Sequence, residues 1–150
     1  MHQFFEQTIT LPCKQEAAWK LLTTSEMTRQ YMYGCDVLSD WQVGSALLWE
    51  GPDGKGGRTV FVNGTIVAID PGQMVEFTMF PTGAPMPDIP ENYLHQRYTL
   101  ASDGDTTRLT IWQGDFTQIA NGQQRYADSQ KGWDTVILEM IRLATELDKA

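Results

Sequence analysis

The chain has 150 residues, of which 41% are hydrophobic and 20% charged, and this composition is typical of one globular domain and excludes a disordered polymer. Its formal net charge of -8 argues against a nucleic-acid partner and against anionic membrane surfaces, because both bind clustered Lys and Arg. We see neither a leader-like segment nor an apolar run of about 18 residues. We therefore expect a single cytoplasmic domain over residues 1–150, with no membrane insertion.

One strand and two short helices are predicted at the start of the chain. Residues 4–11 alternate apolar and polar side chains, which is typical of a strand. Residues 14–22 change to helical spacing, and Cys13 followed by Glu16 is a weak form of the capping box. A second short helix is expected over residues 25–31.

The middle of the chain is predicted to form strands and turns. Six strands are expected, over residues 35–38, 46–49, 59–69, 74–80, 93–100 and 106–112. Gly64 interrupts the longest of these runs and predicts a bulge or a bend. The segment 80–92 holds four prolines, so it cannot be a strand, and long loops of this kind often cover binding sites.

An amphipathic helix is predicted at the end of the chain, from about Ser129 to Asp148, with its start left open between Gln123 and Ser129. Its apolar residues recur at steps of three and four: Trp133, Ile137, Met140, Ile141, Ala144 and Leu147. The predicted order is therefore one strand, two short helices, six strands and one long helix. Because strands and helices are segregated along the chain, the order indicates an α+β fold and not a parallel βαβ sheet.

Five stretches of the chain follow one another in a recognisable order and spacing. They are AAWKLLTTSEMTRQYM (17–32), WQVGSALLWEG (41–51), VNGTIVAIDPGQMVEFTM (62–79), TTRLTIWQGDF (106–116) and KGWDTVILEMIRLATEL (131–147). Together they resemble the SRPBCC superfamily, also called START-like or birch-pollen-allergen-like. The most similar group is related to the C-terminal domain of the Aha-type activator of the ninety-kilodalton heat-shock chaperone.

This resemblance implies a helix-grip fold, in which a curved antiparallel β-sheet wraps around a long C-terminal α-helix and two short helices follow the first strand. It also implies an apolar cavity between the sheet and that helix. It implies no particular reaction, because members of the superfamily include lipid carriers, hormone receptors, polyketide cyclases and chaperone activators.

Residues that bind metals or form nucleophilic pairs are few and scattered. The histidines are His2 and His95, and the cysteines are Cys13 and Cys35, so we predict no metal site, no cofactor and no disulfide. A catalytic pair of Cys35 and His95 stays open as a minor alternative. The glycine-rich segment 51–57 lacks the Gly-Lys-Ser or Gly-Lys-Thr of a phosphate loop and is interpreted as a hairpin loop.

Alternation along the strands and helical spacing at the end of the chain place one set of residues on facing surfaces. These surfaces form either a packed core or, as the resemblance implies, the wall of a ligand cavity. Polar residues of the set are candidates to orient a ligand. The predicted ligand contacts are Val62, Ile66, Phe77, Met79, Gln96, Tyr98, Leu109, Ile111, Gln113, Trp133, Ile137 and Met140.

The favoured function is non-enzymatic binding of a small hydrophobic or aromatic molecule, because the resemblance implies an apolar cavity, aromatic residues and methionines are abundant, and no catalytic set is recognisable. Ligand entry is expected between the long helix and the loop 80–92, with Met140 on the cavity side. Two alternatives remain open: a chaperone cofactor resembling the Aha-type activator, and a cyclase- or hydrolase-like enzyme. The partners considered are therefore a small apolar ligand, a chaperone and a second copy of the chain in a homodimer.

Overall fold

A computed structural model describes residues 2–148 of the chain. The strands are β1 (Phe5–Leu11), β2 (Asp36–Ser39), β3 (Ala46–Pro52), β4 (Arg58–Asp70), β5 (Met74–Pro81), β6 (Leu94–Asp103) and β7 (Thr106–Gly114). The α-helices are α1 (Gln15–Thr23), α2 (Ser25–Tyr31) and α3 (Gly122–Asp148). Single 3-10 turns, η1 (Pro90–Asn92) and η2 (Phe116–Gln118), flank β6 and β7.

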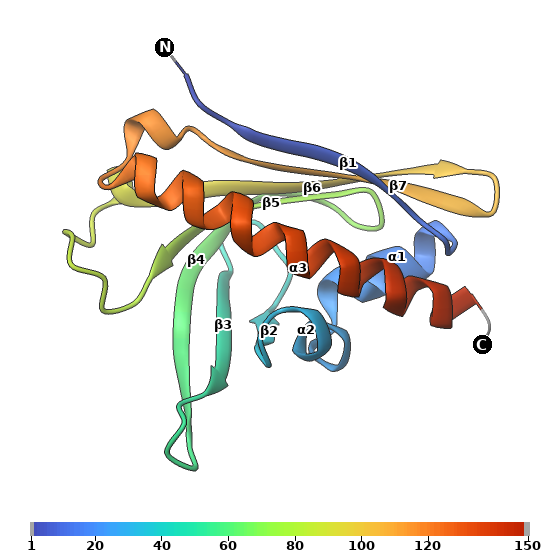
Figure 1. The fold of residues 1–150 in the computed structure, drawn as a ribbon, viewed down its shortest axis with the longest axis horizontal. Helices are drawn as coiled ribbons and strands as arrows, with labels where there is room; N and C mark the ends of the chain where they lie inside the picture. The colour runs from blue at the N-terminus through green and yellow to red at the C-terminus, as the bar shows by residue number, and fades with distance from the viewer. Residues whose placement is uncertain (1, 149–150) are drawn as a thin grey trace.

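The strands form one seven-stranded antiparallel sheet in the order β1-β7-β6-β5-β4-β3-β2. Figure 1 shows that β3 and β4 turn steeply away from β6 and β7, so the sheet is curved. The helix α3 runs across the concave side of the sheet, and α1 and α2 lie beside its C-terminal half. This confirms the predicted α+β helix-grip fold with two short helices after the first strand.

The bend in the sheet follows from the sequence of β4. A side chain at Gly64 would overlap the backbone carbonyl of Thr78 on β5, so only glycine allows the two strands to approach this closely. The pairing of β4 with β5 also shifts register between Ile66 and Ala68. The predicted irregularity is therefore present, but the bulge follows Gly64 by a few residues.

The helix α3 begins at Gly122, next to the early end of the predicted range of starts, and the later start near Ser129 was wrong. The first two turns are polar, so apolar periodicity could not reveal them. Tertiary contacts stabilise this part instead: the ring of Tyr126 packs edge-on against Phe116 at 5.1 Å, and Arg125 Nη1 donates a hydrogen bond to the carbonyl of Asn92 at 2.8 Å.

The predicted capping box at the start of the first helix was also wrong. Lys14, and not Cys13, is the N-cap residue of α1, and the side chain of Lys14 makes no capping hydrogen bond. Glu16 lies in the first turn, where a carboxylate is favourable next to the positive end of the helix dipole, and it forms an exposed ion pair with Lys20 at 3.9 Å. Cys13 is buried before the helix and belongs to the core.

Candidate functional site

A pocket of about 420 Å³ lies between the concave side of the sheet and the middle of α3. The turn between α2 and β2, the strands β3 to β7 and α3 all contribute to its wall. The lining residues are Met32, Tyr33, Cys35, Trp49, Pro52, Phe61, Val62, Met79, Gln96, Gln113, Ser129, Gly132, Trp133 and Val136.

The wall of the pocket is aromatic and apolar, and none of these lining residues is an acid or a base of the Asp, Glu, Lys, Arg or His type. Trp49 and Trp133 are buried in opposite parts of the wall, on β3 and on α3. Large flat rings bury much apolar surface and stack readily on other rings. The pocket is therefore suited to an uncharged apolar or aromatic molecule.

Two glutamines form the polar part of the pocket. Gln96 on β6 and Gln113 on β7 are direct cross-strand partners, only 2% and 4% exposed. Gln113 Nε2 donates a hydrogen bond to Gln96 Oε1 at 2.6 Å. The remaining oxygen, Gln113 Oε1, is buried and accepts no hydrogen bond from the residues that the structure describes.

Tyr98 lies two residues beyond Gln96 on the same side of β6. Its ring packs edge-on against Phe77 and Trp133. Its hydroxyl is buried without a hydrogen-bond partner within residues 2–148. Burial raises the pKa of Tyr98 well above its ordinary range, against a smaller opposing effect of the Gln96 side chain, so the phenol is neutral under all ordinary conditions.

Tyr33 stands at the mouth of the pocket. It is 66% exposed and has a positive φ of 53°, a conformation that costs free energy in any residue with a side chain. Its hydroxyl donates a hydrogen bond to the carbonyl of Gly132 on α3 at 3.3 Å. This ring therefore reaches from the turn after α2 to the long helix.

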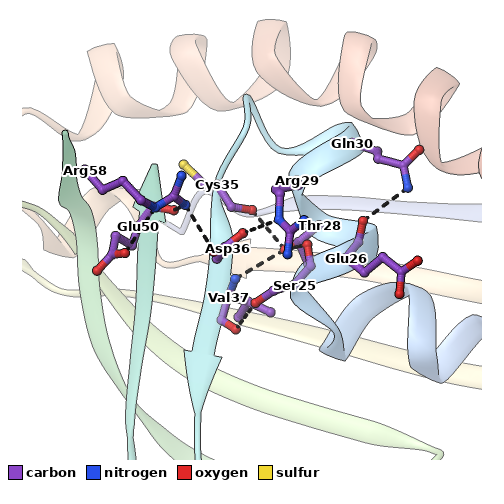
Figure 2. Close-up of polar contacts among 10 residues, drawn as sticks. All are labelled: Ser25, Glu26, Thr28, Arg29, Gln30, Cys35, Asp36, Val37, Glu50 and Arg58. Carbon is purple, nitrogen blue, oxygen red and sulfur yellow. Dashed lines mark hydrogen bonds and ion pairs between the residues drawn. The ribbon is translucent and has the colours of Figure 1, made fainter. Parts of the chain in front are cut away.

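Thr28 fixes the backbone next to the mouth. Figure 2 shows its side chain pointing from α2 toward β2. Its hydroxyl donates to the carbonyl of Cys35 at 2.9 Å and accepts from the N–H of Val37 at 3.2 Å. Because Thr28 is fully buried, these bonds hold the start of β2 firmly against α2.

Asp36 on β2 links α2 and β4 through ion pairs close to Thr28. Its carboxylate pairs with Arg29 Nε on α2 at 2.7 Å and with Arg58 Nη2 on β4 at 3.1 Å (Figure 2). Arg58 also pairs with Glu50 on β3 at 3.3 Å. The network holds the α2–β2 turn beside the β3–β4 hairpin, and these two segments flank the mouth of the pocket.

Cys35 presents a largely buried thiol in the pocket wall. Burial raises the pKa of this thiol, Arg58 lowers it and Asp36 raises it, with a net shift above the ordinary value. The thiol therefore stays protonated near neutral pH and is a poor nucleophile.

The alternative that Cys35 and His95 form a catalytic pair is contradicted by the structure. His95 Nδ1 lies 3.2 Å from Glu76 Oε2, and its neighbour Gln96 faces the concave side, so His95 faces the other side of the sheet. Within residues 2–148, no cluster of three or more His, Cys, Asp or Glu side chains could hold a metal ion. In the same range no helix is long and apolar enough to cross a membrane.

The structure brings five of the twelve predicted ligand contacts to the pocket: Val62, Met79, Gln96, Gln113 and Trp133. The other seven are buried in the core away from the pocket wall: Ile66, Phe77, Tyr98, Leu109, Ile111, Ile137 and Met140. Alternation correctly places the five strand residues of this group on the concave side, and helical spacing correctly predicts that Ile137 and Met140 of α3 are buried. That side is longer than the pocket, however, and close packing of α3 and the short helices fills the rest of it.

The loop 80–92 does not border the pocket, so the predicted entry between this loop and α3 was wrong. The loop is held at the start of α3 instead. Asn92 Nδ2 donates to the carbonyl of Pro87 at 2.9 Å, and Asn92 Oδ1 accepts from the N–H of Ala120 at 3.0 Å. The exposed lining residues, Tyr33 after α2 and Phe61 on β4, instead place the mouth between the α2–β2 turn, the β3–β4 hairpin and α3.

Sequence reasoning missed the residues around this mouth. Trp49 could have been found, because alternation along the predicted strand 46–49 places it on the same face as the buried Leu47. Met32 and Tyr33 lie in a turn, where no periodicity reports orientation. Gly132 and Ser129 lie on the weakly apolar part of α3, which carried no signal of burial.

Comparison with known proteins identifies a family that covers most of the chain. Residues 12–145 match the family described as Activator of Hsp90 ATPase homolog 1-like protein. A search of curated proteins found no match.

Two solved structures illustrate the shared fold. ChR145 from Cytophaga hutchinsonii is 24% identical with a TM-score of 0.75, over 99% of this chain and 97% of that chain. The Aha1 dimer from Colwellia psychrerythraea is 15% identical with a TM-score of 0.68, over 97% of this chain and 96% of that chain. At these identities the likeness concerns the fold alone. Because the family match covers nearly the whole chain, and the helix-grip architecture agrees with it, the chain belongs to the Activator of Hsp90 ATPase homolog 1-like family.

Proposed function

We propose that the chain binds a small, uncharged apolar or aromatic molecule in the pocket between the sheet and α3. The observation that carries this proposal is a pocket of about 420 Å³ whose lining is aromatic and free of charged side chains. A filled core would have no reason to keep such a space, because protein interiors normally pack as densely as organic crystals. Binding without catalysis is favoured, because the thiol of Cys35 is protonated and the lining has no Asp, Glu, Lys, Arg or His that could activate it or the hydroxyl of Ser129.

Native mass spectrometry of the protein released directly from cells tests this proposal. We expect a mass excess on the folded protein that disappears on denaturation, and the released compound should be apolar and uncharged. An adduct of the denatured protein, or an anionic compound, would contradict the proposal.

Gly132→Leu provides a matched variant that blocks the pocket. The nearest atom to a side chain at Gly132 is the hydroxyl of Tyr33 at 3.6 Å, an ordinary contact, so the leucine enters the mouth without a backbone clash. We expect Gly132→Leu to lose the bound compound. Lys131→Leu places the same side chain at the adjacent exposed position of α3 and should keep it. Equal occupancy in both variants would place the ligand elsewhere.

A second candidate function is that of a chaperone cofactor, which the family match favours. Titration of the protein into a ninety-kilodalton heat-shock chaperone tests it, with the ATPase rate as the readout. An unchanged rate at saturating protein would remove this candidate. The similar Aha1 structure is a dimer, so light scattering of the purified chain should accompany the titration and test for a homodimer.

A further inference from the structure

We propose that the Gln96–Gln113 pair is the polar anchor of the pocket, so that it selects uncharged apolar molecules carrying a hydroxyl or N–H donor. This inference rests on the proposed function and names the ligand class more closely. It starts from Gln113 Oε1, which is buried without a hydrogen-bond donor among the described residues. A buried amide oxygen without a partner costs free energy, so this atom favours whatever supplies a donor to it.

The hydrogen bond between the two glutamines leaves one amide oxygen facing the pocket without a donor from residues 2–148. Gln96 and Gln113 are opposite each other on neighbouring strands, and the 2.6 Å hydrogen bond from Gln113 Nε2 to Gln96 Oε1 orients both amides. That bond uses one of the two N–H groups of Gln113 and leaves its oxygen as a free acceptor among the described residues. Both side chains line the pocket, so a ligand in the pocket can reach them.

The surroundings exclude charged ligands. A carboxylate would meet the oxygen of Gln113 without an Arg, Lys or His in the lining to neutralise it. An ammonium group would lose its hydration shell without a carboxylate to pair with. A neutral hydroxyl or N–H group avoids both costs. The rest of the ligand is apolar, because Trp49, Trp133 and Val62 surround it.

Three naphthalene compounds test this selection on the wild-type protein by isothermal titration calorimetry. They are 2-naphthol, which has a neutral donor, 2-methoxynaphthalene, which keeps the oxygen but lacks the donor, and 2-naphthoate, which is charged. Burial of apolar surface alone would favour the methyl ether. We expect 2-naphthol to bind roughly 3- to 10-fold more tightly than the ether, as one neutral hydrogen bond allows, and 2-naphthoate not to bind measurably.

Gln113→Met keeps the length of the side chain and removes the amide. In this variant we expect 2-naphthol to lose its advantage, so that the ether binds at least as tightly, whereas Lys131→Met on the exposed side of α3 should keep the wild-type preference. Should Gln113→Met fail to fold, the side-chain amide signals of Gln113 in the NMR spectrum of the wild-type protein give the same information. 2-Naphthol should shift them clearly further than the ether, which carries the same ring system but cannot donate a hydrogen bond to Gln113.

Each failure has a distinct meaning. Equal affinities of 2-naphthol and the ether for the wild type would overturn the anchor and leave the pocket as an apolar binding site. A preference for 2-naphthol that survives in Gln113→Met would also overturn it, because the donor would then be recognised elsewhere. Binding of neither neutral compound to the wild type would overturn the anchor and the proposed binding function together.

Discussion

The thiol of Cys35 lies in the pocket wall and is 8% exposed, with Arg58 and Asp36 as its charged neighbours. The sequence left open whether this cysteine belongs to a catalytic pair. The chemistry of this thiol depends on burial and on these two charges, and both are consequences of tertiary packing.

We predict that Cys35 reacts slowly with iodoacetamide. Its pKa is raised, so at pH 8 the fraction of thiolate is smaller than in an unhindered thiol, and the rate should increase as the pH rises beyond the ordinary value of 9.0. Mass spectrometry of the peptide containing Cys35 measures the rate, with glutathione as the reference. A bound ligand should slow the reaction further.

The urea-unfolded protein is the control for this measurement, since Cys35 should then react at the rate of glutathione. The prediction would be contradicted by a folded protein in which Cys35 reacts as fast as glutathione at pH 8. Such a result would mean that the thiol is activated, and the enzymatic alternative would regain support.

Among elements, β4 shows most clearly how one residue shapes the sheet. This strand pairs with β3 on one side and β5 on the other, and the sheet turns along it (Figure 1). Gly64 alone predicted an irregularity in this strand. It did not predict that the backbone carbonyl of Thr78 lies against position 64, because that contact depends on how β4 pairs with β5.

We predict that Gly64→Ala lowers the free energy of unfolding by about 3 kcal/mol, the upper end of overpacking costs, because the new methyl group meets backbone and not a movable side chain. Urea denaturation measures the change. Gly132→Ala is the matched control. Its methyl group has only an ordinary contact with Tyr33, and it should raise stability by roughly 0.5–1 kcal/mol through helix propensity. A neutral Gly64→Ala would show that β5 moves away easily.

Across the whole molecule, the concave side of the sheet has two parts. One part faces the middle of α3 and encloses the pocket, and the other is packed solid by α3, α1 and α2. Met140 lies in the solid part and is fully buried. Met140 lies on the same face of α3 as Trp133, which is two helical turns nearer the N-terminus and lines the pocket.

We predict that Met140→Trp destabilises the protein by roughly 1–3 kcal/mol, because a larger ring overpacks a filled core. It should leave ligand binding intact. A ligand at about a hundred times its dissociation constant should still add roughly 2.7 kcal/mol of stability, which melting curves with and without 2-naphthol measure. A Met140→Trp variant of unchanged stability that has lost this ligand shift would place the cavity at Met140 after all.

The sequence by itself determined the order of the elements, the α+β class and the side of the sheet that is buried, because each depends on local periodicity along the chain. It also indicated both glutamines of the pocket, since their position within the strands sets the direction in which they point. Only the tertiary structure decided how far the pocket extends and where it opens. Periodicity tells which face of an element is covered but not how closely the covering element approaches. Ile66 and Val62 therefore share a face of β4, yet only Val62 borders the pocket.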